Sequence, residues 1–319
     1  MIVIGIDVAS KAHHVFGVPG CDRCENAPCG IRKFLKLLPK DAVIGLESTG
    51  GYGLLLAEMA CKAGFVVYMV SGKQVKHYRV SLGRRAKTDR LDAVLIADFV
   101  KREIEHLRPF KPWPADLKQL RDLVRLRTRL AQDKARIRQR MRAMKAKKSD
   151  LDTATRGLET LIKNMDKEIK HKLQAFANAK ALRSCPGIGP LNTAALTAAI
   201  EHFQFEDADA IVAMVGLDMT VDESATIIGK KRITKTGDCT LRHLLYTAAS
   251  SATRTPAWKD DYQALLDKGL QKPQALCALA RKILRVALHL YRNNETFDTK
   301  TRRLHQSKRN AKPMVDNEP

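Results

Sequence analysis

The stretch Ile2-Val3-Ile4-Gly5-Ile6-Asp7 is a short, mostly β-branched apolar run that ends on a carboxylate. Such a run predicts a buried β-strand. A second apolar run, Ala42 to Leu46, ends in the same way on Glu47. If the two strands are neighbours in one sheet, their terminal carboxylates lie at the same edge of that sheet. The pattern therefore predicts an α/β domain with an acidic site at the ends of its strands.

Two more carboxylates, Asp89 and Asp92, begin a segment whose pattern is helical as far as Val100. Residues three apart on a helix share a face. Converging carboxylates repel one another unless cations neutralise them, and hard oxygen ligands select Mg²⁺ or Mn²⁺. Two such ions could clamp the attacking and leaving oxygens of a phosphodiester. We therefore predict a metal-binding catalytic tetrad, which consists of Asp7, Glu47, Asp89 and Asp92.

The rest of the predicted α/β domain alternates strands and helices. Further strands are expected at His14 to Val18 and at Phe65 to Val70, and helices around Ile31 to Leu38 and Leu54 to Ala63. This alternation is typical of a mixed α/β sheet.

The charge balance indicates the kind of partner. The chain has 57 Lys and Arg against 34 Asp and Glu, a net charge of +23, which favours DNA or RNA as a partner. A membrane is the weaker candidate, because apolar runs such as Phe65 to Val70 are far shorter than the roughly 20 residues of a spanning helix. The N-terminus has a strand-like pattern instead of a signal peptide. We expect a cytoplasmic protein without a membrane partner.

The seven cysteines do not indicate a disulfide framework, because their number is odd and no export signal accompanies them. Cys21, Cys24 and Cys29 form a local cluster that could bind zinc together with His13 or His14. No second pair of well-spaced ligands follows, so the sequence leaves this zinc site open.

A long basic helix is predicted from Pro112 to Lys148, because apolar residues recur there at spacings of three and four. Between Lys111 and Lys148 there are 14 Lys or Arg against 3 Asp. A second helical pattern, Leu158 to Leu173, follows Ser149 to Asp152, so we expect an antiparallel helical hairpin or a dimerising coiled coil. The basic face is either solvated or contacts phosphates. The candidate phosphate-binding residues on it are Arg125, Arg129, Arg136 and Arg140.

A third region begins at Ser184 to Pro190, which reads Ser-Cys-Pro-Gly-Ile-Gly-Pro and precedes an Ala-rich helix. A Pro-Gly-Ile-Gly turn resembles the hairpin of helix-hairpin-helix DNA-binding elements, in which Gly187 and Gly189 would let backbone amides approach a phosphate. An ordinary tight turn is the alternative. Closing helices are expected at Leu241 to Ser251, Trp258 to Leu266 and Gln274 to Arg292.

These patterns predict an α/β plus α architecture. The expected parts are a catalytic domain at 1–108, a basic helical hairpin or coiled-coil connector at 109–180, a mostly helical C-terminal domain at 181–300 and a disordered tail at 301–319.

Several motifs also resemble those of one protein family. They are Ile4-Gly5-Ile6-Asp7-Val8-Ala9, Glu47-Ser48-Thr49-Gly50-Gly51-Tyr52, Lys87-Thr88-Asp89-Arg90-Leu91-Asp92-Ala93, Pro186-Gly187-Ile188-Gly189 and Gly216-Leu217. In this order they are similar to the motifs of the DEDD transposases of insertion-sequence family one-ten and of the related Piv-type DNA invertases. The resemblance implies an RNase H-like (RuvC-like) first domain whose tetrad binds magnesium.

The resemblance also implies a serine in the C-terminal domain that attacks DNA and forms a covalent link. The matching residue is Ser224, although Ala225 and Thr226 follow it where the family has small residues such as Gly and Ser. Nearby cations could hold the scissile phosphate. The candidates are Lys230, Lys231, Arg232, Lys235 and Arg242, together with Lys87 beside the tetrad.

The leading hypothesis is a magnesium-dependent transposase that binds donor and target DNA, works as a dimer or tetramer and is guided by a structured noncoding RNA, as the resemblance implies. A Piv-type invertase would use the same residues. A junction-resolving nuclease would use the carboxylates and water, and Ser224 would be dispensable. A nonenzymatic nucleic-acid-binding scaffold would need none of them.

Overall fold

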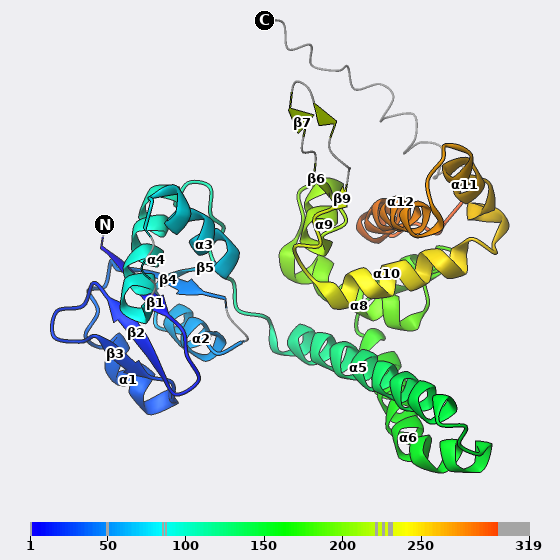
Figure 1. Ribbon diagram of the computed structural model, residues 1–319, viewed down its shortest axis with the longest axis horizontal. Coiled ribbons are helices and arrows are strands. Elements are labelled where there is room, and N and C mark those ends of the chain that lie inside the picture. Colours follow the sequence, from blue (N-terminus) through cyan, green and yellow to red (C-terminus); the bar gives the residue numbers. More distant parts are fainter. Residues whose placement is uncertain are drawn as a thin grey trace, which may run out of the picture. The chain divides into compact units, whose positions relative to one another are not determined.

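A computed structural model of the chain describes residues 2–48, 51–84, 86, 88–220, 223–224, 227–228 and 232–298, with the backbone alone for 223–224 and 227–228. The chain divides into two compact units, Met1–Trp113 and Pro114–Pro319 (Figure 1). The predicted tail at 301–319 lies outside the described residues.

The first unit is built on a five-stranded mixed sheet with the order β3-β2-β1-β4-β5. Strands β1, β4 and β5 are parallel, whereas β2 and β3 are antiparallel to their neighbours. The bounds are Val3–Asp7 for β1, Ala12–Phe16 for β2, Arg23–Glu25 for β3, Val43–Glu47 for β4 and Val66–Val70 for β5. The predicted mixed α/β sheet is confirmed.

Helices cover both faces of this sheet. On one face, Ile4, Ile6 and Leu46 form a buried core with α1 (Pro28–Leu35) and α2 (Leu54–Lys62). On the other face, α4 (Asp89–Glu103) packs directly against β1. A Cβ at Gly5 would overlap the carbonyl oxygen of Ala93, so only glycine allows this close approach.

Two elements of this unit were not predicted. Strand β3 has only three residues, of which Cys24 alone is buried. Helix α3 (Gly72–Ser81) buries only Val75, so it has no apolar periodicity. Its capping box, Ser71 with Gln74, was the available sequence signal. Strand β2 also begins two residues earlier than expected and ends before Gly17, whose φ of +97° interrupts the extended chain.

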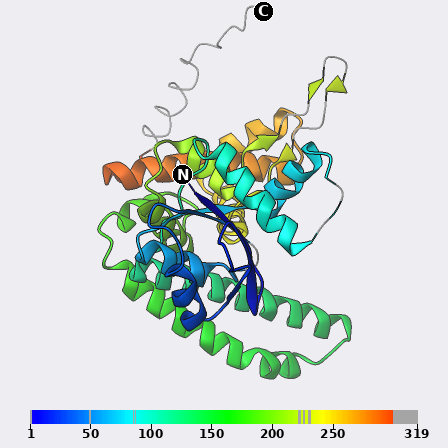
Figure 2. The same cartoon turned by 90° about the vertical axis from the view of Figure 1, so that its left-hand side faces the viewer.

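The second unit begins with two long helices, α5 (Ala115–Ala143) and α6 (Lys148–Leu173), which pack side by side (Figure 2). The expected hairpin is therefore present. The turn, however, spans 144–147, with Lys145 at φ +57°, and the predicted turn residues Ser149 to Asp152 belong to α6. Whether these helices also pair with a second copy of the chain stays a prediction.

The remaining helices enclose one hydrophobic core, to which Leu182, Leu245 and Ile283 contribute. The helices are α7 (Ala179–Ser184), α8 (Pro190–Phe203), α9 (Ala208–Val215), α10 (Cys239–Ala252), α11 (Pro256–Asp267) and α12 (Lys272–Asn293). The three predicted closing helices correspond to α10, α11 and α12, and the predicted Ala-rich helix corresponds to α8, whereas α7 and α9 were not predicted. Trp258 is buried and donates from Nε1 to the carbonyl oxygen of Pro186 at 3.0 Å, which ties α11 to the Pro-Gly-Ile-Gly turn.

Candidate active site

The ends of β1 and β4 bring two of the predicted carboxylates to one face of the sheet. The strands are adjacent and parallel, and Asp7 and Glu47 are their last residues. Because side chains alternate along a strand, Asp7 and Glu47 lie on the same face as Gly5 and Gly45. The structure packs α4 against both glycines, so this face is the one that α4 covers.

The N-terminus of α4 supplies the other two carboxylates. Asp89 and Asp92 lie in its first turn, where the helix dipole favours negative charge. Thr88 caps the helix by accepting a hydrogen bond from the backbone N–H of Leu91 at 3.3 Å. Asp92 is 6% exposed, which is uncommon for an aspartate.

The pKa of Asp7 depends on the other three carboxylates of the tetrad. The pKa of Asp7 is raised from 3.8 to about 7, first by burial and then by the charges of Glu47, Asp89 and Asp92. A side-chain hydrogen bond with Glu47 raises the pKa further. Neighbouring like charges shift a pKa in this way only at short range. The structure thus brings the four predicted carboxylates together.

Two residues that the sequence did not assign to the site contact its carboxylates. Arg79 Nη1, in the last turn of α3, lies 3.0 Å from Asp92 Oδ1. His14 Nε2 lies 3.4 Å from Asp89 Oδ2, and His14 is the register partner of Asp7 on the neighbouring strand. The two tetrad carboxylates of α4 therefore each have a basic or hydrogen-bonding partner from another element.

The donor set fits a hard divalent cation by its chemistry, because all four side chains offer carboxylate oxygens. Within the described residues, however, no three His, Cys, Asp or Glu side chains are placed as ligands around one point. The contacts of the carboxylates give the physical reason: Asp92 and Asp89 are turned toward Arg79 and His14, and Asp7 and Glu47 toward each other.

In the second unit, Ser224 ends the two-residue strand β7 (Glu223–Ser224) and is the register partner of Ile227 in β8 (Ile227–Ile228). Its side chain lies outside the described part of the structure, as do Lys230 and Lys231. The base of this hairpin is formed by β6 (Met219–Thr220) and β9 (Arg232–Ile233). Ser224 thus belongs to a second two-stranded ladder, which lies beyond the β6–β9 pair in the hairpin.

Comparisons with known proteins match both units. A family model described as Transposase matches residues 4–145, and a model described as Transposase IS116/IS110/IS902 family matches residues 179–263. The chain belongs to the IS116/IS110/IS902 family of transposases. It is thus a DNA transposase or recombinase by family.

Relatives of this transposase span most of its length. The pilin gene-inverting protein of Moraxella bovis is 28% identical over 270 residues, which cover 82% of each chain. A probable family 20 transposase of Pseudomonas aeruginosa is 24% identical over 329 residues, or 87% of this chain and 92% of the relative. An uncharacterized 44.8 kDa protein of insertion element IS116 from Streptomyces clavuligerus is 28% identical over 150 residues, or 46% of this chain and 38% of the relative.

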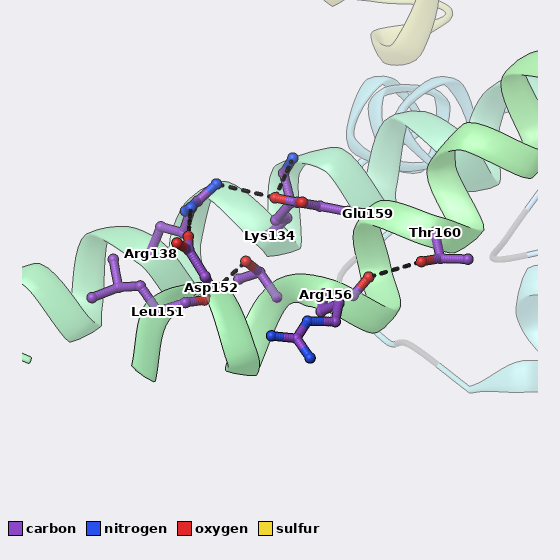
Figure 3. A network of polar contacts seen from close by, with 8 residues as sticks. Lys134, Arg138, Leu151, Asp152, Arg156, Glu159 and Thr160 are labelled. Atoms are coloured by element: carbon purple, nitrogen blue, oxygen red, sulfur yellow. Dashed lines mark hydrogen bonds and ion pairs between the residues drawn. The ribbon is translucent and has the colours of Figure 1, made fainter. Parts of the chain in front are cut away.

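The basic face of α5 in this transposase contains two kinds of arginine. Some tie α5 to α6: Arg138 lies 2.6 Å from Asp152 and 3.1 Å from Glu159 (Figure 3). Among the predicted phosphate-binding residues, Arg129 and Arg140 are exposed. The described residues offer these two arginines no acidic partner. Of the four predicted arginines, Arg129 and Arg140 are therefore the two fully available to an external phosphate.

The other two predicted arginines of α5 have partners within the transposase. Arg125 Nη2 lies 2.7 Å from Asp238 Oδ2 at the N-cap of α10, and Arg136 Nη1 lies 3.3 Å from Asp133 Oδ1. These contacts give Arg125 a structural role, whereas the exposed pair of Arg136 is weak. Both remain candidates for phosphate contact.

The predicted cations around the Ser224 hairpin differ in their surroundings. Arg232 and Lys235 are exposed, whereas Arg242 Nη1 donates to the carbonyl oxygen of Val215 at 2.7 Å. Arg242, on α10, therefore ties α10 to the C-terminal end of α9. Lys87, the candidate beside the tetrad, lies outside the described residues.

The two glycines of the Pro-Gly-Ile-Gly turn also differ. Gly187 has φ +96°, and a Cβ there would lie 2.7 Å from both Ala248 O and Ala252 Cβ, so it is packed against α10. Gly189 is the N-cap of α8, and a Cβ there would meet nothing within 4 Å. If the turn contacts a phosphate, the open side is therefore at Gly189.

The cysteine cluster does not form a metal site within the described residues. Cys24 is 2% exposed, and burial raises the pKa of its thiol to about 12. Cys21 Sγ donates to the carbonyl oxygen of Arg23 at 3.3 Å. Cys24 is thus a buried side chain of β3, and Cys21 belongs to the connection that precedes β3. No helix in the described part of the transposase is long and apolar enough to cross a membrane.

Proposed function

We propose that this transposase cuts and rejoins the DNA of its own insertion sequence with a magnesium-binding carboxylate tetrad and a serine nucleophile. The observation that carries the proposal is the convergence of Asp7, Glu47, Asp89 and Asp92. Burial, together with the charges of the other three carboxylates, raises the pKa of Asp7 to about 7. Four carboxylates held together at such an electrostatic cost point to a cation as their ligand. Mg²⁺ or Mn²⁺ suits oxygen ligands of this kind.

In this proposal the tetrad holds the cation, which when bound would neutralise charge on the scissile phosphate. Ser224 Oγ forms a bond to phosphorus while the bond from phosphorus to the sugar oxygen breaks. The serine hydroxyl loses its proton and the departing sugar oxygen gains one, so the covalent ester conserves the energy needed for rejoining. In the proposal, Lys235 and Arg232 contact the DNA backbone, and their exposure near the hairpin base supports this role.

A structured noncoding RNA and a dimer or tetramer complete the proposal. Support for a polyanionic partner comes from the net charge of +23 and from the exposed Arg129 and Arg140. The mixed sheet with helices on both faces is consistent with the RNase H-like fold that the motifs imply.

The test is an SDS-resistant protein–DNA adduct in cells that carry the gene with its native flanks. Wild type should form the adduct, and both Ser224→Ala and Asp7→Ala should lose it. Arg102→Gln, which changes an exposed arginine at the opposite end of α4 from Asp89 and Asp92, should retain it. An adduct that persists in Ser224→Ala would exclude this serine as the nucleophile. DNA rearrangement without any adduct would favour water as the nucleophile, and unchanged function in Asp7→Asn would favour a nonenzymatic scaffold.

A site-specific invertase is the second candidate, and the match to pilin gene-inverting proteins over 82% of the chain favours it. The same cells decide between the two. Sequencing of the flanks would detect inversion of the intervening segment in one case and excision with insertion elsewhere in the other.

A further inference from the structure

Helix α3 approaches the carboxylate site at both of its ends. It follows β5 after Ser71, and a Cβ at its first residue, Gly72, would overlap Glu47 Oε1. The carboxylate of Glu47 therefore lies against the N-terminus of α3, where unpaired amides and the helix dipole favour negative charge. In the last turn of the same helix, Arg79 contacts Asp92. One short helix thus supplies positive potential to two of the four carboxylates.

The contact between Arg79 and Asp92 is a buried ion pair. The two side chains are 15% and 8% exposed, and the Nη1–Oδ1 distance is 3.0 Å. By contrast, the pair of Arg102 with Asp98 on α4 is 60% and 33% exposed. Burying two charges costs desolvation energy, and such pairs are frequently no more stabilising than apolar packing. Stability alone therefore gives little reason for an arginine at this position.

The position of Arg79 beside the tetrad suggests why an arginine is buried here. Asp92 is one of the three groups whose charges raise the pKa of Asp7, so a cation paired with Asp92 relieves repulsion in the whole cluster. The guanidinium holds Oδ1 of Asp92, an oxygen that a bound divalent cation would also attract. A metal ion, if bound there, would therefore compete with Arg79 for the carboxylate of Asp92.

We propose that Arg79 is the built-in counter-ion of the carboxylate site: it neutralises Asp92 while no divalent cation is bound and gives up this carboxylate when one binds. The inference rests on the metal site of the proposed function. It makes Arg79 a positioning residue, which keeps the metal-free site folded and lowers its affinity for the cation.

Binding of Mn²⁺ to purified full-length protein, measured by titration calorimetry, tests this inference. Arg79→Gln and Arg79→Met both remove the charge. The methionine variant retains the apolar packing of the arginine side-chain stem and is used if the glutamine variant does not fold. Both should bind Mn²⁺ at least about threefold more tightly than wild type, because the competing cation is gone. Without metal, both should unfold at a lower temperature than wild type, and saturating Mn²⁺ should restore much of the difference.

Three controls make the outcomes distinct. Arg79→Lys keeps the charge and should bind Mn²⁺ within about twofold of wild type, as should Arg102→Gln, which breaks the exposed pair on α4. Asp7→Asn should abolish binding. Unchanged or weaker binding by the neutral Arg79 variants, while Asp7→Asn still abolishes it, would overturn the inference and leave the metal site standing. If wild type itself binds no Mn²⁺, the metal site of the proposed function fails and the inference fails with it.

Discussion

Asp7 and Glu47, the last residues of two adjacent parallel strands, share a side-chain hydrogen bond. Burial and the neighbouring carboxylates raise the pKa of Asp7 from 3.8 to about 7. Near neutral pH Asp7 is therefore partly protonated, and this proton reduces the repulsion within the metal-free cluster. A bound cation would remove the need for it.

The stability of the metal-free protein should consequently fall as pH rises from about 4 to about 7. In this window the unfolded carboxyl is ionised while folded Asp7 still binds its proton, so folding takes up a proton and rising pH opposes it. After a discount for solvent screening, we expect a loss of about 1 to 2 kcal/mol. Urea unfolding in EDTA at several pH values measures it. Asp7→Asn should lack this component, whereas Asp41→Asn, at an exposed aspartate, should retain it.

Replacing Asp92 should abolish most recombination. Asp92→Asn removes a carboxylate oxygen from the tetrad and should lower the recombination frequency at least about hundredfold. The matched control is Asp98→Asn on the same helix, because Asp98 also pairs with an arginine, Arg102. This control should stay within a few-fold of wild type, although it loses the hydrogen bond from Tyr78. Equal losses in both variants would mean that α4 tolerates no change of charge, and Asp92 would then have no special role.

Strands β1, β2, β4 and β5 and the carboxylates at the ends of β1 and β4 could be predicted because both leave local signals. Strand β1 is an apolar run that stops at Asp7, and the first turn of α4 places Asp89 and Asp92 on one face. These features depend on the period of the local backbone alone. The helical spacing of apolar residues likewise predicted the hairpin of α5 and α6.

The partners of the carboxylates could not be predicted because they depend on register and on weak elements. His14 meets the site only because the β1–β2 register places it beside Asp7. Arg79 requires α3, whose single buried residue, Val75, gives no apolar period. The side chain of Ser224 lies outside the described residues, so its role as the nucleophile stays a prediction.

A methyl group at the start of α3 should disturb the site more than the fold. A Cβ in Gly72→Ala would overlap Glu47 Oε1, which is the end of a flexible side chain and can move away. The unfolding free energy should therefore change by less than about 1 kcal/mol, while Mn²⁺ affinity and recombination should fall about fivefold to tenfold because Glu47 is displaced. Calorimetry and the recombination assay measure the two effects. A large stability loss with unchanged Mn²⁺ affinity would contradict this account.

The two glycines of the Pro-Gly-Ile-Gly turn should respond in opposite ways. Gly187→Ala should cost about 2 to 4 kcal/mol, because its φ is +96° and its Cβ would press on the backbone of Ala248. Gly189→Ala has open space and should fold normally. If the turn contacts a phosphate, Gly189→Ala should weaken DNA binding at an unchanged melting temperature. Equal stability of the two variants would show that the packing of Gly187 on α10 is not needed.

The exposed arginines of α5 should account for part of the salt dependence of nucleic-acid binding. Arg129 and Arg140 are three helical turns apart and hence on one face. If each neutralises one phosphate, the double variant Arg129→Gln/Arg140→Gln should reduce the slope of log K against log salt by about 2. Arg127→Gln is the matched control, because Arg127 is held by Asp166 of α6 at 2.8 and 3.0 Å. It should destabilise the hairpin slightly and leave the slope nearly unchanged. If the slope falls equally in the control, the basic face acts through its total charge. Arg129 and Arg140 would then contact phosphate no more than the other arginines of α5.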